Sequence, residues 1–189
     1  YAINSCFTLS ILASGKSILF IATIIGMYNG LVQSRIKVDN AWSQIDVQLQ
    51  RRFDLIPNFV ETVKGYMSHE KETFEKIAAL RTSWANAESV SDKAKLDDEL
   101  STTLKTIMAV SESYPELKAN QNFSELSEEL RNTENKISFA RQFYNDCVQK
   151  YNTAIMMFPT NMFAKLLKHD KKEYFKIEEK DKELGKISL

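Results

Sequence analysis

The chain has 189 residues, with 25 lysines and arginines, 25 aspartates and glutamates, and 43% apolar residues. This length suits one domain with a single core. Residues 31–184 contain only one glycine, Gly65, and three prolines, which is too little turn-forming sequence for a sandwich, a barrel or a doubly wound sheet. The sequence therefore predicts an all-α fold. Its zero net charge argues against nucleic acid as a partner, because binding to phosphates needs a clustered positive surface.

The N-terminal region is strongly apolar. Residues 3–27 contain a single charge, Lys16, and a bilayer core about 30 Å thick needs roughly 20 such residues in a helix. Residues 1–27 are therefore predicted to form a membrane-anchor helix, centred on Ile18, Leu19, Phe20, Ile21, Ile24 and Ile25. Two alternatives remain, a cleaved signal peptide without its basic region and a helix that lies in the interface or packs against its own copies.

Charges on the two sides of this run predict its orientation. Residues 1–15 carry no lysine or arginine, whereas Arg35, Lys37, Arg51 and Arg52 follow the run. Because basic residues stay on the cytoplasmic side, a single pass with a cytoplasmic C-terminal domain is expected.

An apolar stripe in alternating steps of three and four residues runs from Val38 to Trp84. This heptad-like spacing is typical of a helix in a bundle or coiled coil. No stop signal separates the stripe from the apolar run, so one long helix is predicted to include both. Pro57 is expected to bend that helix without ending it.

The remaining elements follow from the same periodicity and from capping signals. In chain order they are a turn at 86–93 with Ser91 or Asp92 as a cap, a helix over 92–114, a connection at 115–122 with Asn122 as the next cap, a helix over 123–158 that stops at Pro159, and a short helix over 161–167. Residues 28–167 are thus predicted to form an antiparallel bundle of long helices. The charged tail, residues 168–189, is expected to pack loosely or to wait for a partner.

Several polar residues fall on or beside faces that the periodicity buries. Arg52, Glu70 and Arg81 lie on the first stripe, and Arg141 lies beside a later one. Because charges inside a bundle are costly unless paired, both Arg52 and Arg141 are predicted to be buried and paired. The predicted structural network consists of Arg52, Asp54, Glu61, Glu70, Glu134, Arg141 and Asn145.

No arrangement of residues indicates catalysis, a cofactor or a metal. Gly15-Lys16-Ser17 lacks the first glycine of a phosphate loop, and His69-Glu70 lacks the second histidine of a zinc protease. A di-metal carboxylate site needs glutamates three residues before its histidines, and His169 is preceded there by Leu166. We therefore predict a non-enzymatic protein without a cofactor.

Ordered motifs nevertheless carry a resemblance. They are Tyr28 to Val32, Ala41 to Asn58, His69-Glu70, Tyr114 to Asn120, Thr133 to Ile137, Ala140 to Asn145, and Tyr151-Asn152 to Phe158-Pro159. Over about 28–165 the chain resembles the LemA family. The resemblance implies an antiparallel helical bundle behind one N-terminal membrane helix in a bacterial protein, from a family to which no enzyme activity is assigned. It also implies a link to bacterial membranes, since some relatives are associated with forming or remodelling intracellular membranes, magnetosome membranes included.

Two functions are consistent with these features. The first is a scaffold that self-assembles as a homo-oligomer at a bacterial membrane, with the lipid bilayer and its own copies as partners. The alternative is a membrane-tethered adaptor whose bundle recognises a protein client through the face formed by Asn145, Asn152 and the charged tail. Self-association without an added partner favours the scaffold.

Overall fold

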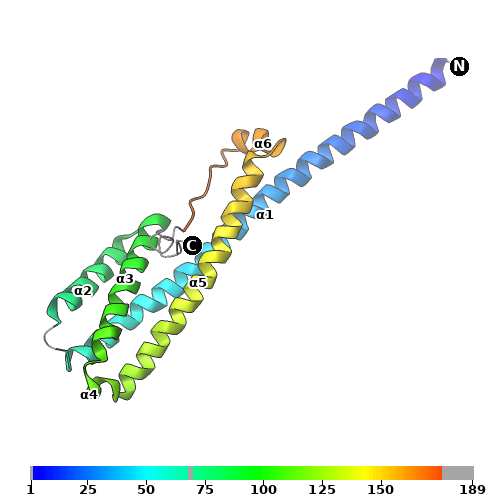
Figure 1. Cartoon of the computed structure of the whole chain (residues 1–189). Helices are drawn as coiled ribbons and strands as arrows, with labels where there is room; N and C mark the ends of the chain where they lie inside the picture. Colours follow the sequence, from blue (N-terminus) through cyan, green and yellow to red (C-terminus); the bar gives the residue numbers. More distant parts are fainter. Residues whose placement is uncertain (1, 68–69, 176–189) are drawn as a thin grey trace, which may run out of the picture. The chain divides into compact units, whose positions relative to one another are not determined.

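The structure is a computed structural model that describes residues 2–67 and 70–175, with side chains from residue 17 onward. The described residues form six α-helices and no strand, which confirms the all-α prediction (Figure 1). The helices are α1 (Ala2–Lys64), α2 (Lys71–Asn86), α3 (Val90–Ser111), α4 (Pro115–Lys118), α5 (Gln121–Met156) and α6 (Thr160–Leu166).

The described residues divide into two compact units. The first, here called the anchor unit, comprises the described parts of 1–40 and 147–172. The second, the bundle unit, comprises the described parts of 41–146 and 173–189. Helices α1 and α5 each contribute residues to both units. The predicted divisions after residues 27 and 167 stay predictions.

The core of the bundle unit forms because each of its helices carries an apolar face. On α1 this face repeats every three or four residues, which is the spacing that keeps side chains on one side of a helix. Each large apolar side chain removed from water contributes about 1.5–3 kcal/mol. Buried members of this core from α1, α2, α3 and α5 include Ile45, Leu49, Ile56, Phe59, Ile77, Trp84, Leu100, Ile107, Leu130 and Ile137.

The prediction of one helix from the N-terminal run to Trp84 is wrong. Helix α1 ends at Lys64, and the carbonyl of Val63 accepts hydrogen bonds of 3.0 Å from both Tyr66 N and Met67 N. Helix α2 then begins at Lys71. The stripe does not reveal this break, because α1 and α2 bury their apolar faces in the same core with nearly unbroken spacing.

Pro57 lies inside α1, so the prediction that it does not end the helix is confirmed. The predicted caps, in contrast, are each displaced by a few residues. Ser89 rather than Ser91 or Asp92 caps α3, since its Oγ accepts a 3.0 Å hydrogen bond from Asp92 N. Similarly, Asn120 Oδ1 rather than Asn122 accepts a hydrogen bond from the first turn of α5.

The C-terminal helices agree with the periodicity. Helix α5 ends at Met156, shortly before Pro159, and α6 follows where a short helix is predicted. The expectation of a loosely packed tail is wrong for residues 172–175, because Phe175 is fully buried. The rest of the tail, residues 176–189, lies outside the described residues.

Candidate functional site

A buried ion pair links α1 to α3 in the bundle unit. Arg52 and Asp97 are each 1% exposed, and Arg52 Nη1 donates a 2.8 Å hydrogen bond to Asp97 Oδ1. The same Nη1 also donates to Ser101 Oγ at 2.9 Å. Arg52 Nη2 reaches Glu134 Oε2 on α5 at 3.4 Å. One guanidinium group therefore holds three helices together.

A second arginine approaches the same carboxylates from α5. Arg141 Nη2 donates to Asp98 Oδ1 at 2.6 Å and lies 3.8 Å from Asp97 Oδ2. Asp97 therefore has a guanidinium group near each of its two carboxylate oxygens. Fork-shaped guanidinium groups suit this role because they offer several donors in fixed directions.

The charge state of Asp97 reflects opposing effects. Burial raises the pKa of Asp97 above its ordinary value of 3.8, because ionisation is costly away from water. The charges of Arg52 and Arg141 act in the opposite direction but do not outweigh burial. Arg52, Asp97, Asp98, Glu134 and Arg141 together form a structural charge cluster that extends from the buried Arg52–Asp97 pair to the partly exposed Asp98 and Glu134.

The sequence identified only part of this cluster. Arg52, Arg141 and Glu134 belong to it, as predicted. Asp54 and Glu61 are exposed, and the carboxylate of Asp54 accepts its hydrogen bond from Gln50 instead. The remaining assignments are corrected as follows: Glu70 is half-buried at the start of α2 without a side-chain cap hydrogen bond, Arg81 is exposed, and Asn145 binds the tail.

Asp97 and Phe175 were missed by the sequence reasoning. Asp97 had a signal, since it continues the stripe of Leu100, Leu104 and Ile107 with a step of three. The signal for Phe175 was weaker: it is an aromatic residue with charged residues nearby in the sequence. Among the described residues, no group of three histidines, cysteines, aspartates or glutamates is arranged to hold a metal.

Phe175 packs against other aromatic side chains in the bundle unit. Its ring lies 6.1 Å from the ring of Trp42, which itself lies 5.7 Å from Tyr144. The guanidinium of Arg141 is 4.3 Å from the centre of the Phe175 ring, a favourable cation–π geometry. The amide of Asn145 then exchanges two hydrogen bonds with the backbone of Phe175, at 2.9 and 3.0 Å.

Asn152 makes the same kind of contact in the anchor unit. Its amide exchanges two hydrogen bonds of 2.9 Å with the backbone of Lys172. The ammonium of Lys172 in turn binds Asp39 at 2.8 Å. Both asparagines of the predicted client-binding face therefore bind the start of the tail, and residues 176–189 of that face lie outside the described residues.

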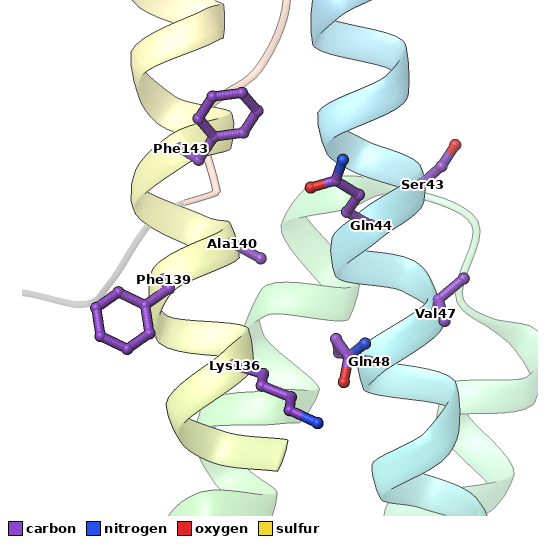
Figure 2. Close-up of a pocket in the computed structure, with 8 residues that line it drawn as sticks. All are labelled: Ser43, Gln44, Val47, Gln48, Lys136, Phe139, Ala140 and Phe143. Atoms are coloured by element: carbon purple, nitrogen blue, oxygen red, sulfur yellow. The ribbon is translucent and has the colours of Figure 1, made fainter. Parts of the chain in front are cut away.

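An open groove lies between α1 and α5 in the bundle unit. Its cavity volume is about 630 Å³, and Figure 2 shows Gln44, Gln48 and Ala140 facing the space between the two helices. The groove is lined by Ser43, Gln44, Val47, Gln48, Lys136, Phe139, Ala140 and Phe143. Val47, Phe139 and Phe143 are each more than half exposed. Gln48 Oε1 is buried without a hydrogen-bond donor.

Beyond Lys136 the same helix pair becomes acidic. Arg51 and Lys136 line the adjoining part together with several glutamates, and Arg51 is already paired with Glu129 at 2.6 Å. The glutamates that line this acidic stretch are Glu61, Glu125, Glu128 and Glu129. The two helices thus present an apolar end and an acidic end.

The predicted anchor residues lie on α1 and face outward. Ile18, Leu19, Phe20, Ile21 and Ile25 are more than half exposed, and Ile24 is half-buried. By length and composition this N-terminal part of α1 can cross a bilayer, and only 6% of its most apolar stretch is buried.

Comparisons with known proteins give one matching family model and several similar proteins. The model of the LemA family matches residues 41–188. Protein LemA of Metamycoplasma hominis is 26% identical over 150 residues, covering 79% of this chain and 68% of that protein. Magnetosome protein MamQ 2 of Paramagnetospirillum magneticum is 25% identical over 184 residues, covering 84% of this chain and 68% of that protein. Magnetosome protein MamQ of Magnetospirillum gryphiswaldense is 23% identical with the same coverage.

Proposed function

The chain belongs to the LemA family, and on this basis we propose that it is a non-enzymatic scaffold that self-assembles at a bacterial membrane. The course of α1 carries the proposal. One uninterrupted helix contains both the outward-facing apolar residues around Phe20 and the buried stripe that begins at Leu31. Its N-terminal part crosses the bilayer, and its C-terminal part supplies the core of the bundle.

The charges around α1 support a cytoplasmic location for the C-terminal part. The described side chains of the anchor unit include seven lysines and arginines against two aspartates, although the whole chain is neutral. Basic residues beside a span stay on the cytoplasmic side. The two similar magnetosome proteins fit a role in membrane organisation.

Self-assembly through the apolar helix is supported by its small residues. In lipid, small side chains allow close approach between helices. An added Cβ at Gly26 or Gly30 would meet nothing within 4 Å, so both glycines lie on open sides of α1. Ser17 and Ala22 add further small positions, and Lys16 needs a protein or water environment.

The mass of the full chain in mild detergent tests the scaffold. Light scattering, corrected for bound detergent, is expected to give an oligomer. Gly26→Leu should lower that mass, because a large side chain separates the helices, whereas the control Ile25→Leu should not. A monomeric wild-type chain at all concentrations would contradict the scaffold.

A second candidate function, a membrane-tethered adaptor, is favoured by the open α1/α5 groove. Exposed Phe139 and Phe143 would accept apolar side chains, and the buried Gln48 Oε1 requires a donor. The acidic end repels the same end of another copy in a parallel arrangement. The occupant that fits best is an amphipathic helix that is apolar at one end and basic at the other.

Synthetic helices test the adaptor. The full chain in detergent should bind an apolar–basic peptide, with affinity that falls as salt rises, and should not bind the same peptide with its lysines replaced by glutamates. Phe139→Asp should abolish binding, whereas the control Tyr174→Asp, outside the groove, should not. A photocrosslinker at Phe143 that yields only a dimer of this chain would assign the groove to the scaffold instead.

A further inference from the structure

The corner between α5 and α6 exposes a dense set of large apolar side chains. Phe158 is 78% exposed and Leu166 is 79% exposed, values that a monomeric soluble surface rarely gathers in one place. The exposed apolar residues of this corner are Met156, Met157, Phe158, Met162, Leu166 and Leu167. Of the residues of α6, only Ala164 is fully buried. The short helix therefore turns most of its apolar surface away from the protein.

Basic residues are interspersed with this apolar surface. Lys165, Lys168 and Lys171 are all exposed, and Asp170 is the acidic residue within 157–172. The other aspartate described in the anchor unit, Asp39, is already bound to Lys172. A surface with apolar residues and three exposed lysines against one aspartate complements the headgroup region of an anionic bilayer.

The corner belongs to the same compact unit as the apolar part of α1. Residues 147–172 and 1–40 share the anchor unit. Figure 1 shows α6 at the end of α5 that lies toward the N-terminal part of α1. Within this unit, Leu31 and Val38 of α1 and Val148 and Ile155 of α5 are buried at matching seven-residue intervals. The exposed corner therefore belongs to the same unit as the end of the apolar run.

We propose that the α5–α6 corner is a second membrane-contact site. Its apolar side chains enter the interface of the bilayer that α1 crosses, and its three lysines bind anionic headgroups. This inference rests on the proposed membrane anchoring by α1 and goes beyond it. The contact fixes the anchor unit against the membrane surface and makes its attachment dependent on lipid charge.

Three phenylalanines with similarly exposed side chains provide a matched test. Phe20 lies in the apolar run, Phe158 at the corner and Phe139 in the α1/α5 groove, and each exceeds 65% exposure. Each would be replaced singly by cysteine in a full chain that carries Cys6→Ser and Cys147→Ala. After labelling with an environment-sensitive fluorophore, the proteins are reconstituted into vesicles of phosphatidylethanolamine with phosphatidylglycerol, or of phosphatidylcholine alone. Part of the lipid carries a nitroxide quencher near the headgroup.

In vesicles that contain phosphatidylglycerol, the fluorophore at position 158 is expected to show a blue-shifted emission and quenching by the nitroxide. Both effects should be lost in vesicles of phosphatidylcholine alone. They should also be lost in the triple variant Lys165→Glu, Lys168→Glu and Lys171→Glu. Position 139 should stay water-exposed. Quenching at position 20 but not at 158 would overturn the corner contact alone, whereas no quenching at position 20 would overturn the proposed anchoring. A blue shift at 158 that is already present in detergent and insensitive to the nitroxide would overturn the inference in favour of a protein contact.

Discussion

Asn145 holds Phe175 through both of its amide atoms: Nδ2 donates to the Phe175 carbonyl and Oδ1 accepts from the Phe175 backbone N–H. The contact fixes the tail by its backbone, whereas the ring is fixed separately against Trp42 and Arg141. Asn145, which the sequence analysis assigned to a charge network, instead binds the C-terminal segment to the bundle unit.

Asn145→Ala is expected to destabilise the protein by about 1–3 kcal/mol, because two hydrogen bonds are lost, each with a net contribution of roughly 0.5–1.5 kcal/mol. Chemical denaturation measures this change, and faster tryptic cleavage after Lys172 reports release of the tail. Asn135→Ala, at an exposed position of the same helix, should change neither. Equal cleavage rates in wild type and Asn145→Ala would contradict the role of Asn145.

Phe175→Ala is expected to lower the free energy of unfolding by about 3–5 kcal/mol, because it leaves a cavity where a fully buried aromatic ring packs. Its neighbour Tyr174 is 41% exposed, so Tyr174→Ala should lower the free energy of unfolding by much less, about 1 kcal/mol or below. The free energies of unfolding of the two variants provide the comparison. Similar values for both would mean that Phe175 does not pack as the structure shows.

Arg52→Met is expected to lower the free energy of unfolding by about 3–5 kcal/mol, because it leaves Asp97 buried without its closest partner. The adjacent Arg51 is 50% exposed in its pair with Glu129, so Arg51→Met should cost less than about 1 kcal/mol. Thermal and denaturant melts distinguish the two. Adding Asp97→Leu to Arg52→Met should restore part of the loss; no recovery would indicate that Arg52 acts through packing alone.

The raised pKa of Asp97 predicts the sign of a pH effect. A carboxyl group with a higher pKa in the folded state holds its proton more tightly there, so its stabilisation is complete below the ordinary value of 3.8 and is lost as pH rises through the folded-state pKa. The free energy of unfolding of the wild type relative to Asp97→Asn should therefore decrease from pH 3.8 upward. An increase over that range would show that the two arginines outweigh burial.

Pro57→Ala should leave α1 intact and stabilise it by up to about 3 kcal/mol, since proline is that much less favourable than alanine inside a helix. Circular dichroism should show unchanged or slightly greater helicity, and the melting temperature should rise. A clear fall in stability would mean that the surrounding core is shaped around the proline.

The sequence by itself determined the helical class and much of the course of the helices. The spacing from Phe123 to Phe158 predicted α5 almost to its ends, because a long apolar stripe on a single helix is a local property of the chain. For the same reason Pro57 was correctly placed inside a helix. The burial of Arg52 followed from its position on a stripe.

Only the tertiary structure decided which elements meet. A stripe shows which side of a helix is buried but not what covers it, so the reversal after Lys64 was not visible in a pattern that continues into α2. The partner of Arg52 lies 45 residues away on α3, and Asn145 pairs with a backbone 30 residues away. Such contacts depend on how the helices pack in space, because residues so far apart in the chain have no periodic relation to one another.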